Sequence, residues 1–448
     1  YNVEKILNQI ETIALNDQFE SVDVQINETI TSNKIDIIFN INESKKFYVK
    51  KINILGNNVT DEKVIRNQIE IDEGDPFNEI LYAKSINNIK SLNFFREVKS
   101  DVLNSEDGSK IINISIDEKP TGEIFAGAGT GTSGTTVSFG VRENNYLGKG
   151  IKLDTNATIS AKSVKGQFIV ENPNYKNSDK SLNLKVESSE IDRLTGQGFK
   201  SNRTGFSTGT RFEYYDNLFL GLSLENFAEK VTVTSAASDK QKKNAGNYFD
   251  SFLGINFDYD KRNQKFATTS GFFSNYAIDI PLFSETGTLN NSYNYKIFSE
   301  LYENNVTTAS ILLKSSFSIN GEDIKLSERL FVPGSRLRGF ERGKIGPKDG
   351  SDYIGGNYLT AINFTSTVPK LLENSQNTDV LIFFDAANLW GVDYDSSIEE
   401  NSEIRSSVGL GLNWLTPIGP LSFSYALPIT QNENDIIEKF RFNLGTTF

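Results

Sequence analysis

The chain has 448 residues, a net charge of −12, and no Cys, His or Met. The absent Cys and His exclude disulfides, thiolate nucleophiles, Ser-His-Asp triads and imidazole metal ligands. We therefore expect no enzymatic activity, no metal and no cofactor. The negative charge disfavours nucleic acid as a partner. Mean hydropathy is −0.38 and no apolar run approaches the roughly 18 residues of a transmembrane helix, but a membrane β-barrel is compatible with this because its alternating strands average out in hydropathy.

Residues 1–45 have the pattern of an incomplete small domain. We expect a helix at Val3–Leu15 and two strands, at Phe19–Ile26 and Lys34–Ile41, joined by a polar turn. The next segment shows the same order preceded by one more strand and one more helix. Together with the missing Met, this predicts a tandem array of such domains from which an N-terminal part has been removed.

Residues 46–119 are interpreted as one complete small domain with the order β-α-α-β-β. Apolar residues alternate in its strands and recur at helical spacing in its helices. The expected elements are a strand at Lys46–Leu55, a helix with Thr60 as its N-cap, a second helix after the break at Gly74, and strands at Phe94–Leu103 and Lys110–Ile116.

Residues 120–448 show almost only period-two alternation, broken by polar loops rich in Gly and Asn. In Ser181–Ile191, for example, one face is apolar and the other is polar. The length accommodates about 16 strands at roughly 20 residues per strand and loop. Closure into a barrel removes the sheet edges that hydrocarbon does not tolerate. We therefore predict a transmembrane β-barrel of about 16 antiparallel strands preceded by α+β domains, with a soluble all-β array as the alternative.

The most distinctive loop contains Leu337, Arg338, Gly339 and Phe340, after a polar stretch and before several glycines. Gly allows a tight turn, Phe tends to be buried, and a buried Arg needs an acidic partner. These residues predict a loop tip inserted into the barrel. The alternative is a flexible external loop in which the Arg has no special role.

Asp385 is the candidate partner of Arg338. It shares one face of an apolar strand with Leu381 and Phe383. A carboxylate facing lipid would be costly, so Asp385 is expected to face the lumen and to pair with a cation. The alternative is a strand-end residue that hydrogen-bonds a turn.

The chain resembles the BamA-type outer-membrane assembly factors. The β-α-α-β-β unit is similar to a POTRA domain, and Leu337 to Phe340 is similar to the Val/Leu/Ile-Arg-Gly-Phe loop motif of that family. Further matching motifs are Gly56-Asn57, Gly74-Asp75-Pro76-Phe77, Asn144 to Gly150, Asn172 to Tyr175, Phe384 to Trp390 and Ser407 to Pro428.

The resemblance implies a 16-stranded outer-membrane barrel at 120–448, a POTRA domain at 46–119 and part of another at 1–45, both in the periplasm of a Gram-negative bacterium. It implies that Arg338 enters the lumen and pairs with Asp385. The family usually carries a Glu on the strand after the loop, where this chain has Thr365. Arg338 is therefore expected to rely on Asp385 alone, with a loop anchored less firmly.

The first and last barrel strands are expected to form a weak seam, or lateral gate. The first strand, Gly122–Gly131, is rich in Gly and Ala, which weaken a strand and leave its register loosely specified. Its neighbour on closure is the last strand, Glu438–Phe448. An opened seam would offer a sheet edge to a substrate strand. The alternative is that the glycines only relieve crowding under a lumenal plug. The candidate gate residues are Gly122, Phe125, Gly127, Gly129, Gly131, Phe440, Phe442, Leu444 and Phe448.

The resemblance implies an assembly factor that captures unfolded outer-membrane proteins on its POTRA domains and inserts them through this gate. The implied partners are such clients, outer-membrane lipids, accessory lipoproteins of an assembly complex and periplasmic chaperones. One alternative is a two-partner-secretion or autotransporter-assembly transporter of the same superfamily. Another is a passive porin, although a diffusion pore does not need POTRA domains.

Overall fold

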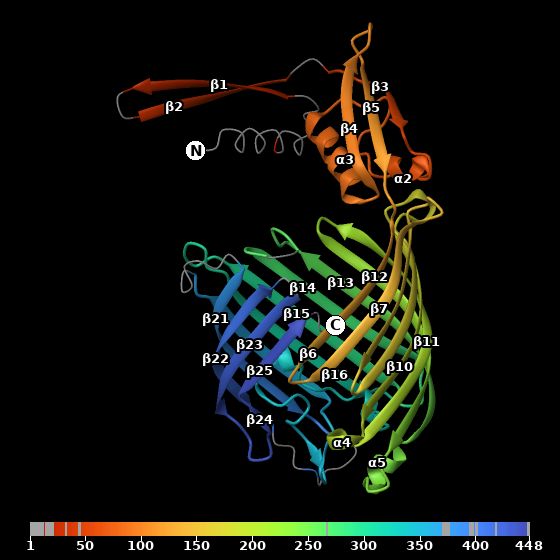
Figure 1. Cartoon of the computed structure of the whole chain (residues 1–448), viewed down its shortest axis with the longest axis vertical. Helices are drawn as coiled ribbons and strands as arrows, with labels where there is room; N and C mark the ends of the chain where they lie inside the picture. Colours follow the sequence, from red (N-terminus) through yellow and green to blue (C-terminus); the bar gives the residue numbers. More distant parts are fainter. Residues whose placement is uncertain are drawn as a thin grey trace. The chain divides into compact units, whose positions relative to one another are not determined.

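The computed structural model describes residues 13, 22–31, 34–43, 46–265, 268–369, 377–393, 398, 402–416 and 419–445. The chain forms two compact units, one of Tyr1–Gly122 with Glu143–Lys152 and the other of Glu123–Arg142 with Leu153–Phe448. Figure 1 shows the elements of both units. Within the described part of the chain, no helix is both long enough and apolar enough to cross a membrane.

The first described elements are a strand pair. Strands β1 (Val22–Thr31) and β2 (Lys34–Glu43) form a two-stranded antiparallel sheet. The strand pair was predicted, although β1 extends beyond Ile26 to Thr31. The predicted helix at Val3–Leu15 lies outside the described residues, apart from Ile13.

The following domain has the predicted β-α-α-β-β order. Its three-stranded sheet has the order β3-β5-β4, with β3 parallel and β4 antiparallel to the central β5. Helix residues Ile65, Ile86 and Ile89 pack with the strand residues Ile112 and Ile114 into one buried core. The elements are β3 (Val49–Leu55), α2 (Glu62–Arg66), α3 (Glu79–Ser91), β4 (Phe95–Asn104) and β5 (Lys110–Glu118).

The predicted helix cap at Thr60 was wrong. Asp61 is the N-cap of α2 and makes no side-chain capping bond. The true cap signal lies at α3, where the Asn78 side chain accepts hydrogen bonds from the backbone N–H groups of Ile80 and Leu81. Thr60 instead belongs to the turn before α2, where its backbone N–H donates to Glu118.

The Glu118 carboxylate holds that turn by accepting three backbone hydrogen bonds. Asn58 and Val59 donate to Oε2 over 2.9 Å each, and Thr60 donates to Oε1 over 2.7 Å. Burial alone would raise the pKa of Glu118, but the hydrogen bonds from Thr60, Val59 and Asn58 lower it below its ordinary value of 4.5. The ionised carboxylate therefore stabilises the domain.

We expect Glu118→Gln to lower the stability of fragment 46–119 by roughly 1–2 kcal/mol at pH 7, because bonds to an ionised acceptor are lost. Since the folded pKa is depressed, the contribution is complete above the unfolded pKa of about 4.5 and disappears as the pH falls through the folded value. Urea unfolding at pH 7 and pH 3 measures both effects, with the exposed Glu106→Gln as the control. Equal stability of the native and Glu118→Gln fragments at pH 7 would contradict the expectation.

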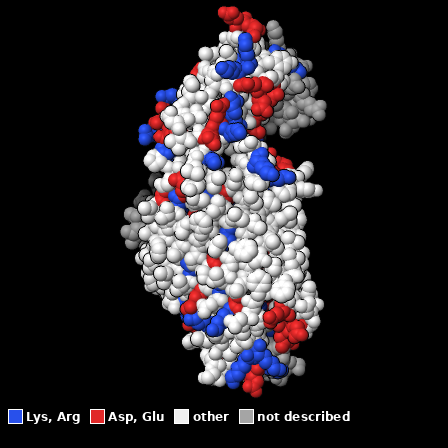
Figure 2. Space-filling model, turned by 90° about the vertical axis from the view of Figure 1, so that its right-hand side faces the viewer, with Lys and Arg blue, Asp and Glu red and all other residues white. Residues whose placement is uncertain are grey.

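The predicted barrel is confirmed: sixteen antiparallel strands form one closed sheet. Exposed apolar side chains alternate with inward ones along the strands, as at Leu184, Val186 and Leu410. Figure 2 shows mostly uncharged side chains over the part of the wall that faces the viewer. An uncharged outer band of this kind suits contact with lipid.

The barrel strands have different lengths, and the longest are β11, β12 and β13. They are β6 (Gly122–Gly131), β7 (Gly134–Tyr146), β8 (Ile151–Ser160), β9 (Ser163–Asn172), β10 (Ser181–Arg193), β11 (Phe199–Tyr215), β12 (Leu218–Val233), β13 (Gly246–Asp260), β14 (Gly271–Phe283), β15 (Thr288–Ser299), β16 (Thr307–Ser318), β20 (Tyr358–Thr367), β21 (Thr378–Trp390), β22 (Arg405–Thr416), β23 (Gly419–Thr430) and β25 (Phe440–Gly445).

Short elements lie in the connections between barrel strands. They are η1 (Tyr175–Asn177), α4 (Leu194–Gln197), α5 (Asp239–Lys243), η2 (Leu326–Glu328), η3 (Gly334–Arg336), β17 (Gly339–Phe340), β18 (Lys348–Asp349), β19 (Asp352–Tyr353) and β24 (Ile437–Glu438).

Candidate functional site

The segment 319–357 between β16 and β20, here called the lumenal loop, returns into the barrel. Its residues Leu337 and Phe340 are each 2% exposed and pack against Leu312 of β16 and Leu359 of β20. Leu312 is buried while its neighbour Leu313 is exposed, and side chains alternate across a strand, so the buried set faces inward. The loop motif therefore rests on the inner wall of the barrel.

Arg338 and Asp385 form the centre of this contact. Asp385 is fully buried, and its Oδ2 accepts hydrogen bonds from Arg338 N at 3.0 Å and Arg338 Nε at 2.7 Å. Its Oδ1 accepts from Arg338 Nη2 and from Asn363 Nδ2, both at 2.8 Å. Both carboxylate oxygens are thus satisfied, as a buried charge requires.

Neighbouring side chains fix the position of Arg338. Ser407 Oγ of β22 donates to the Arg338 carbonyl over 2.6 Å, and the guanidinium carbon lies 3.4 Å from the ring centroid of Phe383. Thr365, at the place where the family usually has Glu, is 3.4 Å from Arg338 Nη2, a long hydrogen bond. Asp385 thus supplies the charged contacts of Arg338.

Gly339 allows the loop to approach the wall. Its φ is +93°, which favours Gly, and an added Cβ would lie 3.1 Å from the Cβ of Ala426 and 3.4 Å from that of Ser407. A side chain at this position would be strained and crowded. The next residue, Phe340, is then delivered into the buried cluster.

Arg336 is a second loop arginine that the sequence analysis missed. Its Nη1 donates to Ser310 over 2.7 Å and to Asn363 over 3.1 Å, and its Nη2 donates to Asn294 over 2.8 Å. These acceptors belong to β16, β20 and β15. Arg336 thereby joins three wall strands through neutral partners, which carry no recognisable charge pattern in the sequence.

Lys325 forms a third anchor, also missed by the sequence analysis. It is 1% exposed, and its Nζ lies 2.5 Å from Asp250, 3.4 Å from Glu229 and 3.2 Å from Glu328. Burial raises the pKa of Glu328, an effect that Lys325 partly offsets. One ammonium group thus compensates a cluster of three carboxylates between the loop and strands β12 and β13.

We expect Lys325→Met to destabilise the barrel by roughly 2–4 kcal/mol, because it leaves buried carboxylates without a cation while Glu328 can take up a proton. The temperature at which the folded band disappears in SDS gels measures the loss. The defect should be smaller at pH 5 than at pH 8, since protonation relieves the repulsion. The exposed Lys243→Met is the control, and an unchanged transition in Lys325→Met would contradict this role.

Two further ion pairs hold the connections near the lumenal loop. Arg329 pairs with Asp393 and donates to Asn357 Oδ1 over 2.8 Å. Burial would raise the pKa of Asp393, but Arg329 and a hydrogen bond from Asn357 bring it below its ordinary value. Arg405 and Asp435, each with a side chain 1% exposed, form the second pair at 3.0 Å.

Residues 343–353 of the lumenal loop contact the segments that connect other barrel strands at the same end of the barrel. Ser238 beside α5 donates to Asp349 over 2.5 Å, Gln197 of α4 donates to the Gly343 carbonyl over 3.4 Å, and the Tyr353 hydroxyl donates to the Asn434 carbonyl. The loop thus closes over this end of the lumen.

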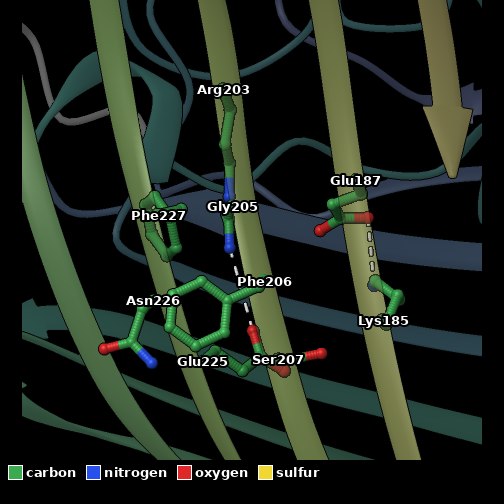
Figure 3. Close-up of a pocket in the computed structure, with 9 residues that line it drawn as sticks. All are labelled: Lys185, Glu187, Arg203, Gly205, Phe206, Ser207, Glu225, Asn226 and Phe227. Atoms are coloured by element: carbon green, nitrogen blue, oxygen red, sulfur yellow. Dashed lines mark ion pairs between the residues drawn. The ribbon is translucent and has the colours of Figure 1, made fainter. Parts of the chain in front are cut away.

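A small pocket lies in the barrel wall (Figure 3), and the ring of Phe227, one of its lining residues, has its centroid 5.9 Å from Lys325 Nζ. The pocket is lined by charged side chains of β10, β11 and β12, including Glu187, Arg203 and Glu225. Its volume of about 10 Å³ is the space of about one water molecule. Lys185 pairs with Glu187 over 2.9 Å, and Arg203 lies 3.8 Å from Glu225. The pocket is therefore a part of the polar inner wall and has no room for a ligand.

In the described part of the chain, the first and last strands meet in a seam of three residue pairs. Gly129, Thr130 and Gly131 of β6 pair with Gly445, Leu444 and Asn443 of β25. Other neighbours pair over longer stretches, such as β11 and β12 from Phe199 to Tyr215. An added Cβ at Gly131 would lie 2.4 Å from Asn443 Oδ1 and 2.5 Å from the Phe442 carbonyl. Gly131 therefore relieves crowding against the last strand and not against the lumenal loop.

The candidate gate residues occupy different places. Gly129, Gly131 and Leu444 lie in the paired part of the seam, and the Phe442 carbonyl accepts from Thr132 N over 3.1 Å. Phe440 lies at the start of β25, stacked on Phe423 with centroids 6.1 Å apart.

The remaining candidate gate residues are outside the paired part of the seam. Gly122, Phe125 and Gly127 have no partner in the described part of the last strand, and Phe125 packs beside Gly140 of β7. Phe448 lies outside the described residues.

The predicted start of the last strand at Glu438 was wrong. Ile437 and Glu438 form β24, which pairs with Phe340 and Gly339 of β17 in the lumenal loop. The wall strand β25 begins only at Phe440. The chain therefore pairs with the loop before it enters the wall, because the loop presents a free backbone edge there.

Family models match most of the chain. The Omp85 superfamily domain matches residues 145–448, and the POTRA model, described as a surface antigen variable number repeat, matches residues 47–119.

Curated relatives and a solved structure are similar over nearly the whole chain. The outer membrane protein assembly factor BamA of Neisseria meningitidis serogroup B is 25% identical over 96% of this chain and 60% of its own length. The BamA of Neorickettsia risticii is 24% identical over 93% and 57%. This chain thus spans about 60% of these relatives. The crystal structure of BamA from Haemophilus ducreyi lacking POTRA domains 1–3 has a TM-score of 0.78 at 23% identity, covering 100% of this chain and 94% of that one.

Proposed function

The chain belongs to the Omp85 superfamily, and on that premise we propose that it is an outer-membrane protein assembly factor that folds client β-barrels and inserts them into the membrane. The barrel lies in the outer membrane and the POTRA domain in the periplasm. Relatives named as BamA match both parts together, which supports assembly as the shared task.

The observation that carries the proposal is the short seam between β6 and β25. In the described residues, three pairs join the two strands, from Gly129 with Gly445 to Gly131 with Asn443, and β6 is rich in Gly and Ala, which weaken a strand. Opening of this join would expose a free edge on β6. A free edge can accept a client strand by β-augmentation, in which backbone hydrogen bonds supply the affinity. Such an edge does not require a particular client sequence.

The POTRA domain offers a second place for client capture. In its sheet order β3-β5-β4, strands β3 and β4 are the edges. An extended segment of a client can add to the β4 edge by the same backbone pairing, whereas on the β3 edge Val49 N and Ile52 N already donate to Asp75 and Glu73. The proposed partners are therefore unfolded outer-membrane proteins, with membrane lipids, accessory lipoproteins and periplasmic chaperones as the further components. No covalent chemistry is required, because client folding into the bilayer supplies the free energy.

The anchored lumenal loop disfavours a passive porin, which needs an open lumen. The similarity of nearly the whole chain to relatives named BamA favours assembly over secretion transport. Here the loop is held to the inner wall by Arg338, Arg336 and Lys325. A steady large conductance in planar bilayers that survives deletion of residues 1–119 would favour the porin.

The test is folding of a urea-denatured eight-stranded client barrel into phospholipid vesicles that contain this chain. Folding is followed by the shift of the client band in SDS gels without heating. We expect the client to fold several-fold faster than in vesicles that contain an equal amount of a porin. Equal rates in the two kinds of vesicle would refute the proposed function.

A further inference from the structure

Arg441 of β25 connects the last strand to the lumenal loop. Its Nη1 donates to the Gly334 carbonyl over 2.7 Å, and its Nη2 donates to the Phe340 carbonyl over 2.8 Å. Glu438 orients the guanidinium through bonds of 2.8 Å to Nε and 2.5 Å to Nη2. The side chains of Arg441 and Glu438 are only 11% and 24% exposed, so solvent screens these contacts weakly.

Backbone hydrogen bonds extend the same connection. Strands β17 and β24 pair antiparallel, and Glu341 N donates to the Ile436 carbonyl over 2.8 Å. Ile436 N in turn donates to the Lys344 carbonyl over 3.2 Å. The loop is itself fixed to β21 through Asp385, so a continuous set of bonds runs from that wall strand to the last strand.

The first strand has no comparable connection. In the part of the chain that the structure describes, β6 is bonded to its neighbours β7 and β25, and no hydrogen bond joins it to the lumenal loop. Among the described residues, the two sides of the seam are therefore held unequally, because β25 is bonded to the lumenal loop and β6 is not.

We propose that Arg441 is a positioning residue that clamps the start of the last strand to the lumenal loop, so that β25 stays in place while β6 moves when the seam opens. This inference rests on the proposed function, because the clamp matters only if the seam opens as a gate. It assigns β25 as the fixed edge of that gate. A fixed β25 keeps the barrel wall continuous with β23, where Ala426 N donates to the Lys439 carbonyl over 2.8 Å.

Distances between spin labels on the whole chain in lipid vesicles test the clamp without any client. The chain has no Cys, so labels go only where Cys is introduced. One pair joins Ile124 of β6 to Tyr276 of β14 across the barrel, and the other joins Phe440 of β25 to Tyr276. All three side chains are exposed on the outer face, at 86%, 38% and 52% for Ile124, Tyr276 and Phe440.

We expect a narrow distance distribution for the Phe440 pair and a broad one for the Ile124 pair. Arg441→Ala should broaden the Phe440 pair and leave the Ile124 pair unchanged, and Arg441→Lys should restore part of the narrow distribution. Arg211→Ala, which removes a partly exposed arginine of β11, is the matched control and should change neither pair. Glu438→Gln provides a second, milder variant, expected to broaden the Phe440 pair by less.

A Phe440 pair as broad as the Ile124 pair in the native chain would overturn the clamp. An unchanged Phe440 distance distribution in both Arg441→Ala and Glu438→Gln would also overturn the clamp. Both variants are measured on protein that keeps its folded band in SDS gels. Client folding is measured separately on the same samples. A narrow Phe440 pair in a chain that does not accelerate client folding would refute the proposed function and leave the clamp standing.

Discussion

Asp385→Ala is expected to lower the stability of the barrel by about 3–5 kcal/mol and to remove most of its client-folding activity. Asp385 is fully buried and accepts three hydrogen bonds from Arg338 and one from Asn363. Without it, no described carboxylate lies within ion-pair distance of the Arg338 guanidinium, whose side chain is 18% exposed, and Thr365 offers only a hydroxyl at 3.4 Å. Arg338→Ala should have a similar effect, since it leaves a buried carboxylate.

Heat-induced loss of the folded band and the client-folding rate together measure this expectation. Asp379→Ala is a matched control, because Asp379 is an exposed carboxylate of the same strand and should change stability by less than about 0.5 kcal/mol. Exchanging the two charges, Arg338→Asp with Asp385→Arg, should recover part of the lost stability and activity. It should not recover the hydrogen bond from the backbone N–H of residue 338 to a carboxylate at residue 385. Unchanged client insertion in both single variants would show that the loop needs no such anchor.

A disulfide across the seam is expected to abolish client folding, with full recovery on reduction. Thr130 and Leu444 are register partners on β6 and β25, so their Cα atoms are close enough for a disulfide in an antiparallel ladder. The variant Thr130→Cys with Leu444→Cys therefore locks the seam that the proposed mechanism opens. The chain has no native Cys to confuse the result.

Client folding is measured before oxidation, after oxidation and after dithiothreitol. Leu410→Cys with Tyr425→Cys provides the control, because these exposed partners join β22 to β23 away from the seam. The oxidised control should keep its activity. Full activity of the oxidised seam variant would remove the lateral gate from the mechanism.

Much of the fold could be predicted because it depends on local pattern. Alternation placed β6 at Gly122–Gly131 with the bounds that the structure has, and it placed Asp385 on the inner face. The pairing of Arg338 with Asp385 followed from the resemblance and from the rule that a buried charge needs a counter-charge.

The parts that were missed depend on contacts between distant segments. Lys325 lies in a polar stretch that has no periodicity, and its partners Asp250 and Glu229 come from strands far along the chain. Likewise, nothing local shows that Glu438 pairs with the lumenal loop before the last strand begins, since its alternation continues that of β25. Such positions are decided by tertiary packing and not by propensity.

The lumenal loop also has a consequence for the permeability of the membrane. The wall partners of Lys325, Arg329 and Arg338 lie on β12, β13 and β21 or just after β21, and none of them belongs to β6, the strand that is proposed to move. A seam that parts sideways therefore leaves these attachments intact. We expect the outer membrane to stay sealed against small solutes such as antibiotics while a client passes laterally into the lipid, so that gate opening and leakage are separate events.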